Sequence, residues 1–338
     1  MTITQRDPVT GAVALRRAVA LAVGLVVLGV VAVVSIGVGA HPIAPAEVVR
    51  ALVDFQGTDD HLIVREVRVP RALLGMGVGA ALAVAGALIQ TLSRNPLAEP
   101  GILGVTAGAG FALTVGSGLG VAVSAIAELG VAVVGAVLTT VLVYSVGRSS
   151  PLRLVLAGVA VSAVLSGVAL GMRLMLPDVF DQYRYWSVGS LAGREQAPLL
   201  VPMVAIGLAL LGALVVSYAL NVVALGDNVA HTLGANVKQV RTTTLVLITV
   251  LAGAATAVAG PILFVGLIVP HLLRRMVTGS VPWLVAYSMV AGPILLLVSD
   301  TIARVLLPTG EVPVAIVTAF VGGPMLIWVV RRYGAGSL

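Results

Sequence analysis

Long apolar runs separated by short polar segments recur along the whole chain. Runs of about 20 residues can cross a hydrocarbon core of about 30 Å as α-helices. Because their apolar residues are continuous and do not alternate, a β-barrel is excluded. We count about ten runs, at roughly 15–37, 72–92, 102–120, 129–146, 154–172, 199–220, 243–259, 262–273, 283–299 and 312–330. The short run at 262–273 is expected to be re-entrant or broken. The pattern predicts an all-α integral membrane protein with about ten transmembrane helices.

One apolar sequence occurs twice. GAALAVAG at 79–86 and GAATAVAG at 253–260 agree at seven of eight positions with an offset of 174, and Pro96 and Pro270 share that offset. The copies lie in the second and seventh predicted spans, so they cross the membrane in opposite directions. This predicts one transmembrane domain of two inverted-topology halves, about 1–198 and 199–338. Chance similarity between helices rich in Ala, Gly and Val is the alternative.

Composition supports a membrane protein and removes other classes. Hydrophobic residues make up 59% of the chain and charged residues 10%, against about 25% charged in soluble domains. The net charge of +6 is scattered through short loops, which argues against nucleic-acid binding. The chain has no cysteine, so disulfides and thiolate metal sites are excluded. The first apolar run is longer than a signal-peptide core and is expected to stay as an uncleaved span.

The basic residues predict the orientation. With the N-terminus inside and ten spans, twelve of the 20 basic residues lie inside, which obeys the positive-inside rule weakly and places both termini in the cytoplasm. Four of the outer arginines lie between Arg50 and Arg71, where that rule disfavours them. A role other than membrane insertion is therefore expected for them.

The polar segment at about 221–242 is predicted to lie inside, as one or two short amphipathic helices. Leu225, Val229 and Leu233 fall near helical spacing, and Gly226 and Gly234 punctuate them. An interfacial helix would carry basic residues along its polar face. The sparse basic residues here favour a surface that docks a soluble partner.

Chemistry for energy conversion is missing from the sequence. No P-loop motif occurs and Lys238 is the only lysine, so an ATPase site is not recognisable. The four histidines are isolated, and no hydrolase or metal motif accompanies them. Ion-coupled carriers need ionisable groups buried in their spans, and these are nearly absent here. We therefore expect a transport subunit that is not an enzyme, binds no cofactor of its own and takes its energy from a partner.

Six ordered motifs carry a family resemblance. They are VRVPR at 67–71, RNPLAEPGILGV at 94–105, LRLVLAGVAVSA at 152–163, LNVVALGDNVAHTLGANV at 220–237, AVAGPILFVGLIVPHLLR at 257–274 and DTIARVLLPTGEVPVAIVTAFVGGP at 300–324. The chain resembles, over nearly its whole length, the FecCD-type permeases of ABC importers for iron-siderophores, haem and vitamin B12.

The resemblance implies the assembly and the cargo. Such type II importers have ten-helix permeases that pair with a second copy or a paralogue in a bacterial cell membrane. Two cytoplasmic ATPase subunits hold ATP and Mg, and an extracytoplasmic solute-binding protein delivers the cargo. A ferric siderophore is favoured, with haem and a corrinoid left open. An ion-coupled secondary transporter is the alternative function, and a membrane-embedded scaffold has no positive support.

The resemblance also assigns roles to single residues. It implies that Arg68, Arg71 and Arg304 meet glutamates of the binding protein, which suits arginine's bidentate pairing with carboxylates. Anchoring near lipid headgroups is the alternative. The resemblance implies that residues 224–234 insert into the ATPase as coupling helices, through Leu225, Gly226, Asp227, Val229, Leu233 and Gly234. Asp227 is expected at the N-cap of the second helix.

The remaining implied roles concern the pathway. Asn95 and Leu97 match a cytoplasmic constriction, and Ser149 and Ser150 stand in the neighbouring gate loop; ordinary turns are the alternative. Arg173 could attract an anionic ferric chelate at the entrance, or could extend its side chain towards lipid headgroups.

Overall fold

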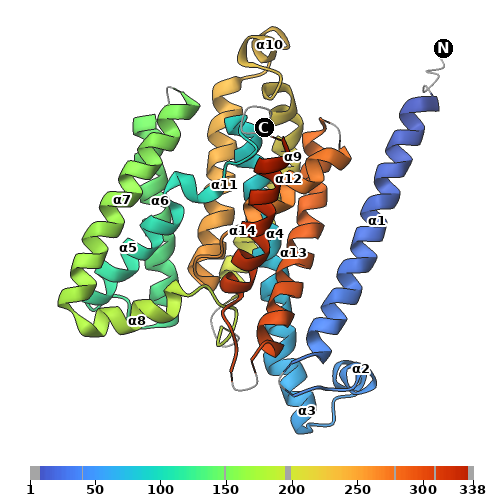
Figure 1. Cartoon of the computed structure of the whole chain (residues 1–338), viewed down its shortest axis with the longest axis vertical. Coiled ribbons are helices and arrows are strands. Elements are labelled where there is room, and N and C mark those ends of the chain that lie inside the picture. Colours follow the sequence, from blue (N-terminus) through green and yellow to red (C-terminus); the bar gives the residue numbers. More distant parts are fainter. Residues whose placement is uncertain are drawn as a thin grey trace.

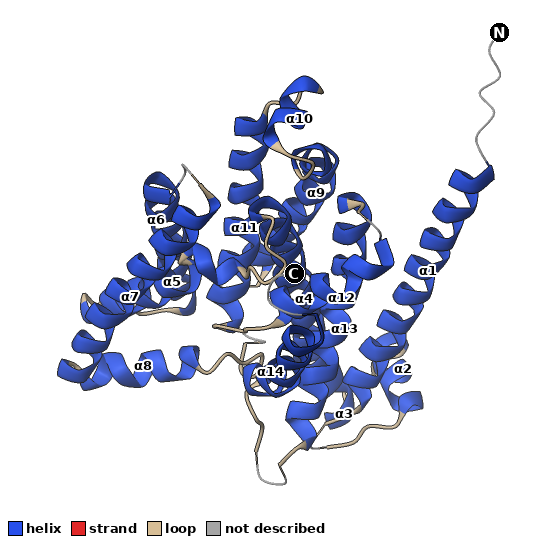
Figure 2. Cartoon of the chain, turned by 45° about the horizontal axis from the view of Figure 1, so that its top comes forward, coloured by secondary structure: helices blue, strands red, loops and turns tan. Residues whose placement is uncertain are grey.

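Each apolar run predicted from the sequence contains a helix in the computed structural model. The structure describes residues 8–39, 41–147, 150–194, 199–277, 279–307 and 310–333, and these residues contain no β-strand. Figure 2 shows the chain as helices joined by short connections. The all-α prediction is therefore confirmed for the described part of the chain.

The helices are α1 (Pro8–Gly37), α2 (Pro45–Val53), α3 (Asp59–Leu62), α4 (Val69–Ser93), α5 (Val105–Gly118), α6 (Ala125–Gly147), α7 (Pro151–Met175), α8 (Pro177–Ser187), α9 (Leu200–Val223), α10 (Asp227–Thr232), α11 (Val237–Ala259), α12 (Val265–Val277), α13 (Val281–Val305) and α14 (Val314–Tyr333). A π-helical turn, Ile63–Arg68, leads into α4, and a 3₁₀ turn, Pro100–Leu103, precedes α5.

Helix α4 lies at the centre of the molecule. It packs against α9, α11, α12 and α13, while α1 packs on the outer side of α13 (Figure 1). Helices α5, α6 and α7 form a second group, which joins the centre through contacts of α11 with α5 and α6. Helix α8 runs across one end of this group (Figures 1 and 2). The connection that carries α10 lies at the opposite end of the molecule from α2 and α3.

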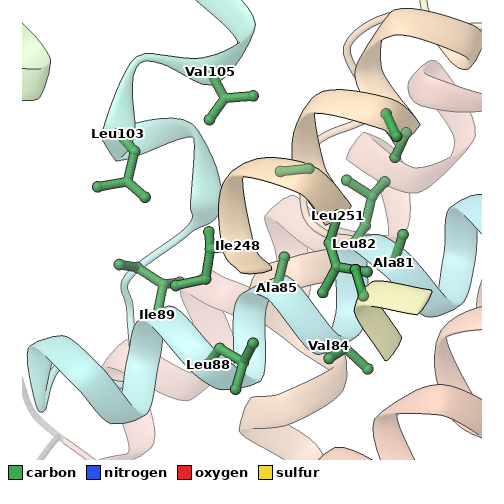
Figure 3. Close-up of a cluster of buried hydrophobic side chains, with 14 of the residues drawn as sticks. Ala81, Leu82, Val84, Ala85, Leu88, Ile89, Leu103, Val105, Ile248 and Leu251 are labelled. Carbon is green, nitrogen blue, oxygen red and sulfur yellow. The ribbon is translucent and has the colours of Figure 1, made fainter. Parts of the chain in front are cut away.

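The repeated sequence falls on the two central helices. The first copy lies in α4 and the second ends α11, and the two helices pack together in opposite directions (Figure 1). Just before the second copy, Ile248 of α11 lies beside Ile89 of α4, and Leu251 lies beside Leu82 (Figure 3). Small residues let the helix backbones approach closely. The backbone of α4 at Gly79 lies against the backbone of α13 at Gly292.

Seven described helices are long and apolar enough to cross a membrane: those at 12–37, 59–93, 125–147, 152–175, 200–223, 237–259 and 281–305. Helices α5 and α12 have 14 and 13 residues. At 1.5 Å per residue each covers about 20 Å, less than the hydrocarbon core. The run predicted at 102–120 is longer than α5 because it includes apolar residues of the 3₁₀ turn before the helix, whereas the run predicted at 262–273 was already short.

The predicted loop at 221–242 is shorter in the structure. Helix α9 continues to Val223 and α11 begins at Val237, so residues 224–236 form the connection that carries α10. We call these residues the α10 connection. The prediction was too long because α9 continues through the apolar residues Val222 and Val223. Helix α11 begins with largely polar residues, 237–242, ahead of its apolar run.

Candidate functional site

The structure brings Arg68, Arg71 and Arg304 together at the end of the molecule near α2 and α3. Arg71 of α4 places Nη2 2.9 Å from Asp300 Oδ1 and Nη1 2.8 Å from Glu311 Oε2. Arg304 of α13 places Nε 3.2 Å from Asp300 Oδ2. One buried carboxylate therefore joins two guanidinium groups from different helices. We call these five residues the arginine cluster.

Arg68 and Arg304 also hold the end of α1. Arg68 Nη1 donates to the carbonyl oxygens of Ile36 at 2.7 Å and Gly37 at 2.8 Å. Arg304 Nη1 donates to the carbonyl oxygen of Val38 at 2.8 Å. The last carbonyls of a helix have no partner within it, and arginine side chains can satisfy them. The cluster thus ties α1 to α4 and α13.

The arginines of this cluster are buried in the single chain. Arg68, Arg71 and Arg304 are 5–7% exposed, whereas the Glu311 side chain is 36% exposed. Anchoring in lipid headgroups does not fit side chains so enclosed. Their guanidinium groups are already paired within the chain, so an incoming carboxylate would have to exchange with one of these partners.

The α10 connection presents apolar side chains at the opposite end of the molecule. Leu225, Val229 and Leu233 are 65%, 43% and 63% exposed. Gly226 and Gly234 have φ values of +120° and +79°, which glycine adopts without a Cβ clash. The connection therefore turns out of α9, forms one short helix, and turns back into α11 with its apolar residues outward.

Asp227 is the first residue of α10, and its N-cap is Gly226, so the expected capping role is wrong. Its carboxylate instead accepts from two arginines. Arg94 Nη2 lies 2.8 Å from Asp227 Oδ1, and Arg241 Nη2 lies 2.8 Å from Oδ2. Two guanidinium groups draw the carboxylate away from the helix terminus.

The expected gate residues occupy two separate places. Asn95 Oδ1 accepts from the Leu97 backbone N–H at 2.9 Å, and Leu97 lines a small cavity with His271 of α12 and Met325 of α14. Ser150 caps α7 by accepting from the Arg153 N–H at 3.2 Å. It lines a different cavity, of about 700 Å³, beside α10. Ser149 lies outside the described residues.

Arg173 lines a third cavity, of about 480 Å³, between α5, α7 and α8. Its guanidinium carbon lies 3.6 Å from the centroid of the Tyr183 ring, and its Nε donates to the Ala169 carbonyl oxygen at 2.9 Å. Ser162 and Ser166 face the same cavity. The arrangement is a polar stripe on α7 that ends in a fixed cation, so Arg173 points into a cavity and not towards headgroups.

Comparisons with known proteins decide the family. A family model described as the FecCD transport family matches residues 26–332. The chain belongs to this family. The ferric enterobactin transport system permease protein FepD of Escherichia coli (strain K12) is 44% identical over 304 residues, 88% of this chain and 91% of that protein. The hemin transport system permease protein HmuU of Yersinia pestis is 36% identical, covering 79% of this chain and 82% of that protein.

A solved structure agrees with the fold. A metal-chelate type ABC transporter in an inward-facing conformation matches with a TM-score of 0.83 at 29% identity, covering 92% of this chain and 98% of that chain. With the apolar helices described above, these similarities make this FecCD family member a multi-pass membrane protein.

Sequence reasoning missed several residues at these sites. It did not find the partners of Arg71, which are Asp300 and Glu311, because this pairing joins positions more than 200 residues apart. It also missed Tyr183 of α8, whose ring meets Arg173 of the preceding helix. The polar stripe of α7 was detectable, since Ser162, Ser166 and Arg173 recur at helical spacing within an apolar run.

Proposed function

We propose that the chain is the transmembrane permease subunit of a binding-protein-dependent ABC importer of a metal chelate, with a ferric siderophore as the favoured cargo. The observation that carries the proposal is the exposed apolar surface of the α10 connection, formed by Leu225, Val229 and Leu233. Hydrophobic side chains held outward at a helix turn fit a groove on a soluble partner. Membership of the FecCD family supports an ATPase subunit as that partner.

The proposed topology has ten membrane-crossing segments in two inverted halves. The antiparallel packing of α4 and α11, which carry the repeated sequence, supports it. Short α5 and α12, each preceded by a non-α segment, fit the discontinuous helices of inverted-repeat transporters. The N-terminal end of α1 lies at the same end as α10 (Figure 1), which supports cytoplasmic termini in a bacterial cell membrane.

The arginine cluster is the proposed docking point for the extracytoplasmic solute-binding protein. Its three cations exceed its two carboxylates, and it lies at the end of the molecule opposite α10. Glu311 is its accessible member. We infer that a glutamate of the binding protein replaces Glu311 on Arg71, so that the guanidinium stays paired throughout docking.

The polar stripe of α7 is the proposed wall of the translocation pathway. Much of α7 is exposed in the single chain. A second permease copy or a paralogue packed nearby would enclose a pathway beside it. Arg173, held by Tyr183, supplies a cation for an anionic chelate, while hydroxyl groups of Ser162 and Ser166 offer weak contacts that let cargo move on. Asn95 and Leu97, with Ser149 and Ser150, are the proposed cytoplasmic gate.

Reconstitution tests the function. The permease is placed in vesicles with its ATPase and binding protein, and uptake of ferric catecholate, ferric hydroxamate, haem and a corrinoid is measured with and without ATP. We expect ATP-dependent uptake of a ferric chelate that requires the binding protein. Uptake that proceeds without the ATPase and follows an ion gradient would contradict the proposal and support a secondary transporter.

A further inference from the structure

One carboxylate connects three helices at the end that carries α10. Asp227, the first residue of α10, lies 2.8 Å from Arg94 Nη2 at the end of α4 and 2.8 Å from Arg241 Nη2 of α11. Arg94 Nη2 also donates to the carbonyl oxygen of Val223, the last residue of α9, at 3.0 Å. Arg94 therefore holds both ends of the turn that leads into α10.

The backbone of Arg94 is held in an unusual conformation. It is the C-cap of α4 with φ +52° and ψ +32°, in the left-handed region where glycine is favoured. A non-glycine residue there is disfavoured and persists where its surroundings demand it. Glycine would fit this backbone better, so we infer that the contacts of the Arg94 side chain offset the cost of the conformation. That side chain reaches α10.

The residues after Arg94 form a tight, hydrogen-bonded turn. The Asn95 N–H donates to the Gln90 carbonyl oxygen at 3.2 Å, and the Ala98 N–H donates to the Asn95 carbonyl oxygen at 3.1 Å. Asn95 Oδ1 accepts from the Leu97 N–H at 2.9 Å. These hydrogen bonds connect the end of α4 at Arg94 to Leu97, which lies against α12 and α14 in the small cavity described above.

Space is available for such a displacement. The cavity of about 700 Å³ is lined by Arg94, Asp227 and Arg241 on one side and by Ser150, at the start of α7, on another. The ion pairs can shift into this space without repacking a filled core. Ser150 of the gate loop thus lines the same cavity as the three charged residues, and Arg94 directly precedes the other proposed gate residue, Asn95.

We propose that the Arg94–Asp227–Arg241 network transmits movement of α10 to the turn at Asn95–Ala98, with Arg94 and Asp227 as positioning residues. This inference rests on the proposed function, in which α10 contacts the ATPase. Half-exposed ion pairs contribute only about 0–1 kcal/mol to stability, so removing them leaves the fold intact. Covering α10 with a partner removes water and strengthens the pairs.

The chain has no cysteine, so Leu97→Cys supplies the single thiol of this permease chain, and labelling is read on that chain after it is separated from its partners. Its labelling by a membrane-impermeant maleimide is measured in vesicles, without nucleotide and with ATP and vanadate. Transport per ATP hydrolysed is measured in matching variants that keep Leu97. Asp227→Asn and Arg94→Gln should each reduce the nucleotide-dependent change in labelling, and the transport per ATP, by about fivefold or more. Arg94→Lys should retain part of both.

Lys238→Gln is the matched control. Lys238 lines the same cavity, one turn from Arg241 on α11, but makes no ion pair within the described residues. Lys238→Gln removes one positive charge, as Arg94→Gln does, and it should behave as wild type. Unchanged labelling and unchanged transport per ATP in Asp227→Asn and Arg94→Gln would overturn the inference and leave the proposed function standing.

Two other outcomes also contradict the inference. If Asp227→Asn no longer binds the ATPase, Asp227 is a direct contact of the partner and not part of a connection to the gate. If the wild-type permease itself fails to bind an ATPase, the proposed function falls, and this inference falls with it. Measuring ATPase binding for every variant separates these cases.

Discussion

A Cβ atom on Gly79 of α4 would lie 2.7 Å from the carbonyl oxygen of Gly292 of α13. The two helices therefore meet backbone to backbone at this point, in the same way that small residues allow close crossings in other membrane proteins. The same pair of helices carries Arg71 and Arg304, so this crossing positions the arginine cluster.

Gly79→Ala should destabilise the permease. The added methyl group would meet backbone atoms of α13, which cannot move aside as a flexible side chain can. Overpacking of this kind costs about 1–3 kcal/mol. Thermal unfolding in detergent, followed by size-exclusion chromatography, measures the loss. Gly29→Ala on α1, where a Cβ would meet nothing within 4 Å, should cause no loss. Equal unfolding temperatures for the two variants would contradict the tight crossing.

Arg71→Gln should leave Asp300 buried with one fewer cationic partner. Breaking one side of a buried ion pair costs about 3–5 kcal/mol, whereas replacing both members with apolar residues is often tolerated. We therefore expect low yield of folded Arg71→Gln protein. Because Asp300 also pairs with Arg304, Arg71→Met with Asp300→Leu would leave Arg304 buried without a carboxylate and should not restore the yield.

Arg50→Gln supplies the comparison for this experiment. Arg50 forms an exposed pair with Glu47, and such pairs contribute less than about 1 kcal/mol. Yield and unfolding temperature of this variant should match wild type. If Arg71→Gln behaved like it, the cluster would not be structural.

Val229→Glu tests the α10 connection. Val229 is exposed, so the change should not affect folding, but it places a charge in the proposed ATPase groove. Binding of the ATPase should weaken by about tenfold or more, as at an interface hot spot. Co-purification and titration measure it. Val53→Glu, an exposed change on α2 at the other end of the molecule, should bind the ATPase normally.

Glu311→Gln tests the exchange of carboxylates on Arg71. Removing the accessible carboxylate leaves that face of Arg71 free for the binding protein. Docking at low salt should strengthen by up to about 1 kcal/mol, about fivefold in Kd, and should fall more steeply as salt rises. Affinity is measured with permease in nanodiscs. The same affinity and salt slope as wild type would argue that docking does not involve Arg71.

Arg173→Gln tests the cation in the α7 cavity. Uptake of an anionic ferric chelate should slow by about tenfold as electrostatic attraction is lost, while a neutral chelate is unaffected. Arg184→Gln changes a nearby exposed arginine that does not line the cavity, and should leave both rates unchanged. Equal slowing of both chelates by Arg173→Gln would indicate a structural role instead.

Much of the fold follows from sequence because hydrophobic length and continuity determine which segments can lie in a bilayer. The repeated sequence falls on α4 and α11, which pack together at the centre of the molecule. Helix ends were harder to predict. Apolar residues before α5 and α12 are not helical, and no hydrophobic pattern distinguishes a 3₁₀ turn such as Pro100–Leu103 from the first turn of an α-helix.

The site residues that sequence could predict are those whose pattern is local in the chain. Leu225, Val229 and Leu233 could be predicted because their spacing is local, and the structure places all three on the surface. Pairings across the chain could not. Asp227 resembled a helix cap in sequence, and its actual partners, Arg94 and Arg241, are reached only through the folding of α4 and α11 around it.

Residues 78–91 of α4 are all buried by other helices. This part of α4 therefore has no side that meets lipid, although it lies in a membrane protein. A complete substitution scan along it should reveal no 3.6-residue rhythm of tolerance, whereas α1 should show a strong one. Changes in bilayer thickness or lipid type can affect this part of α4 only by moving the helices that surround it.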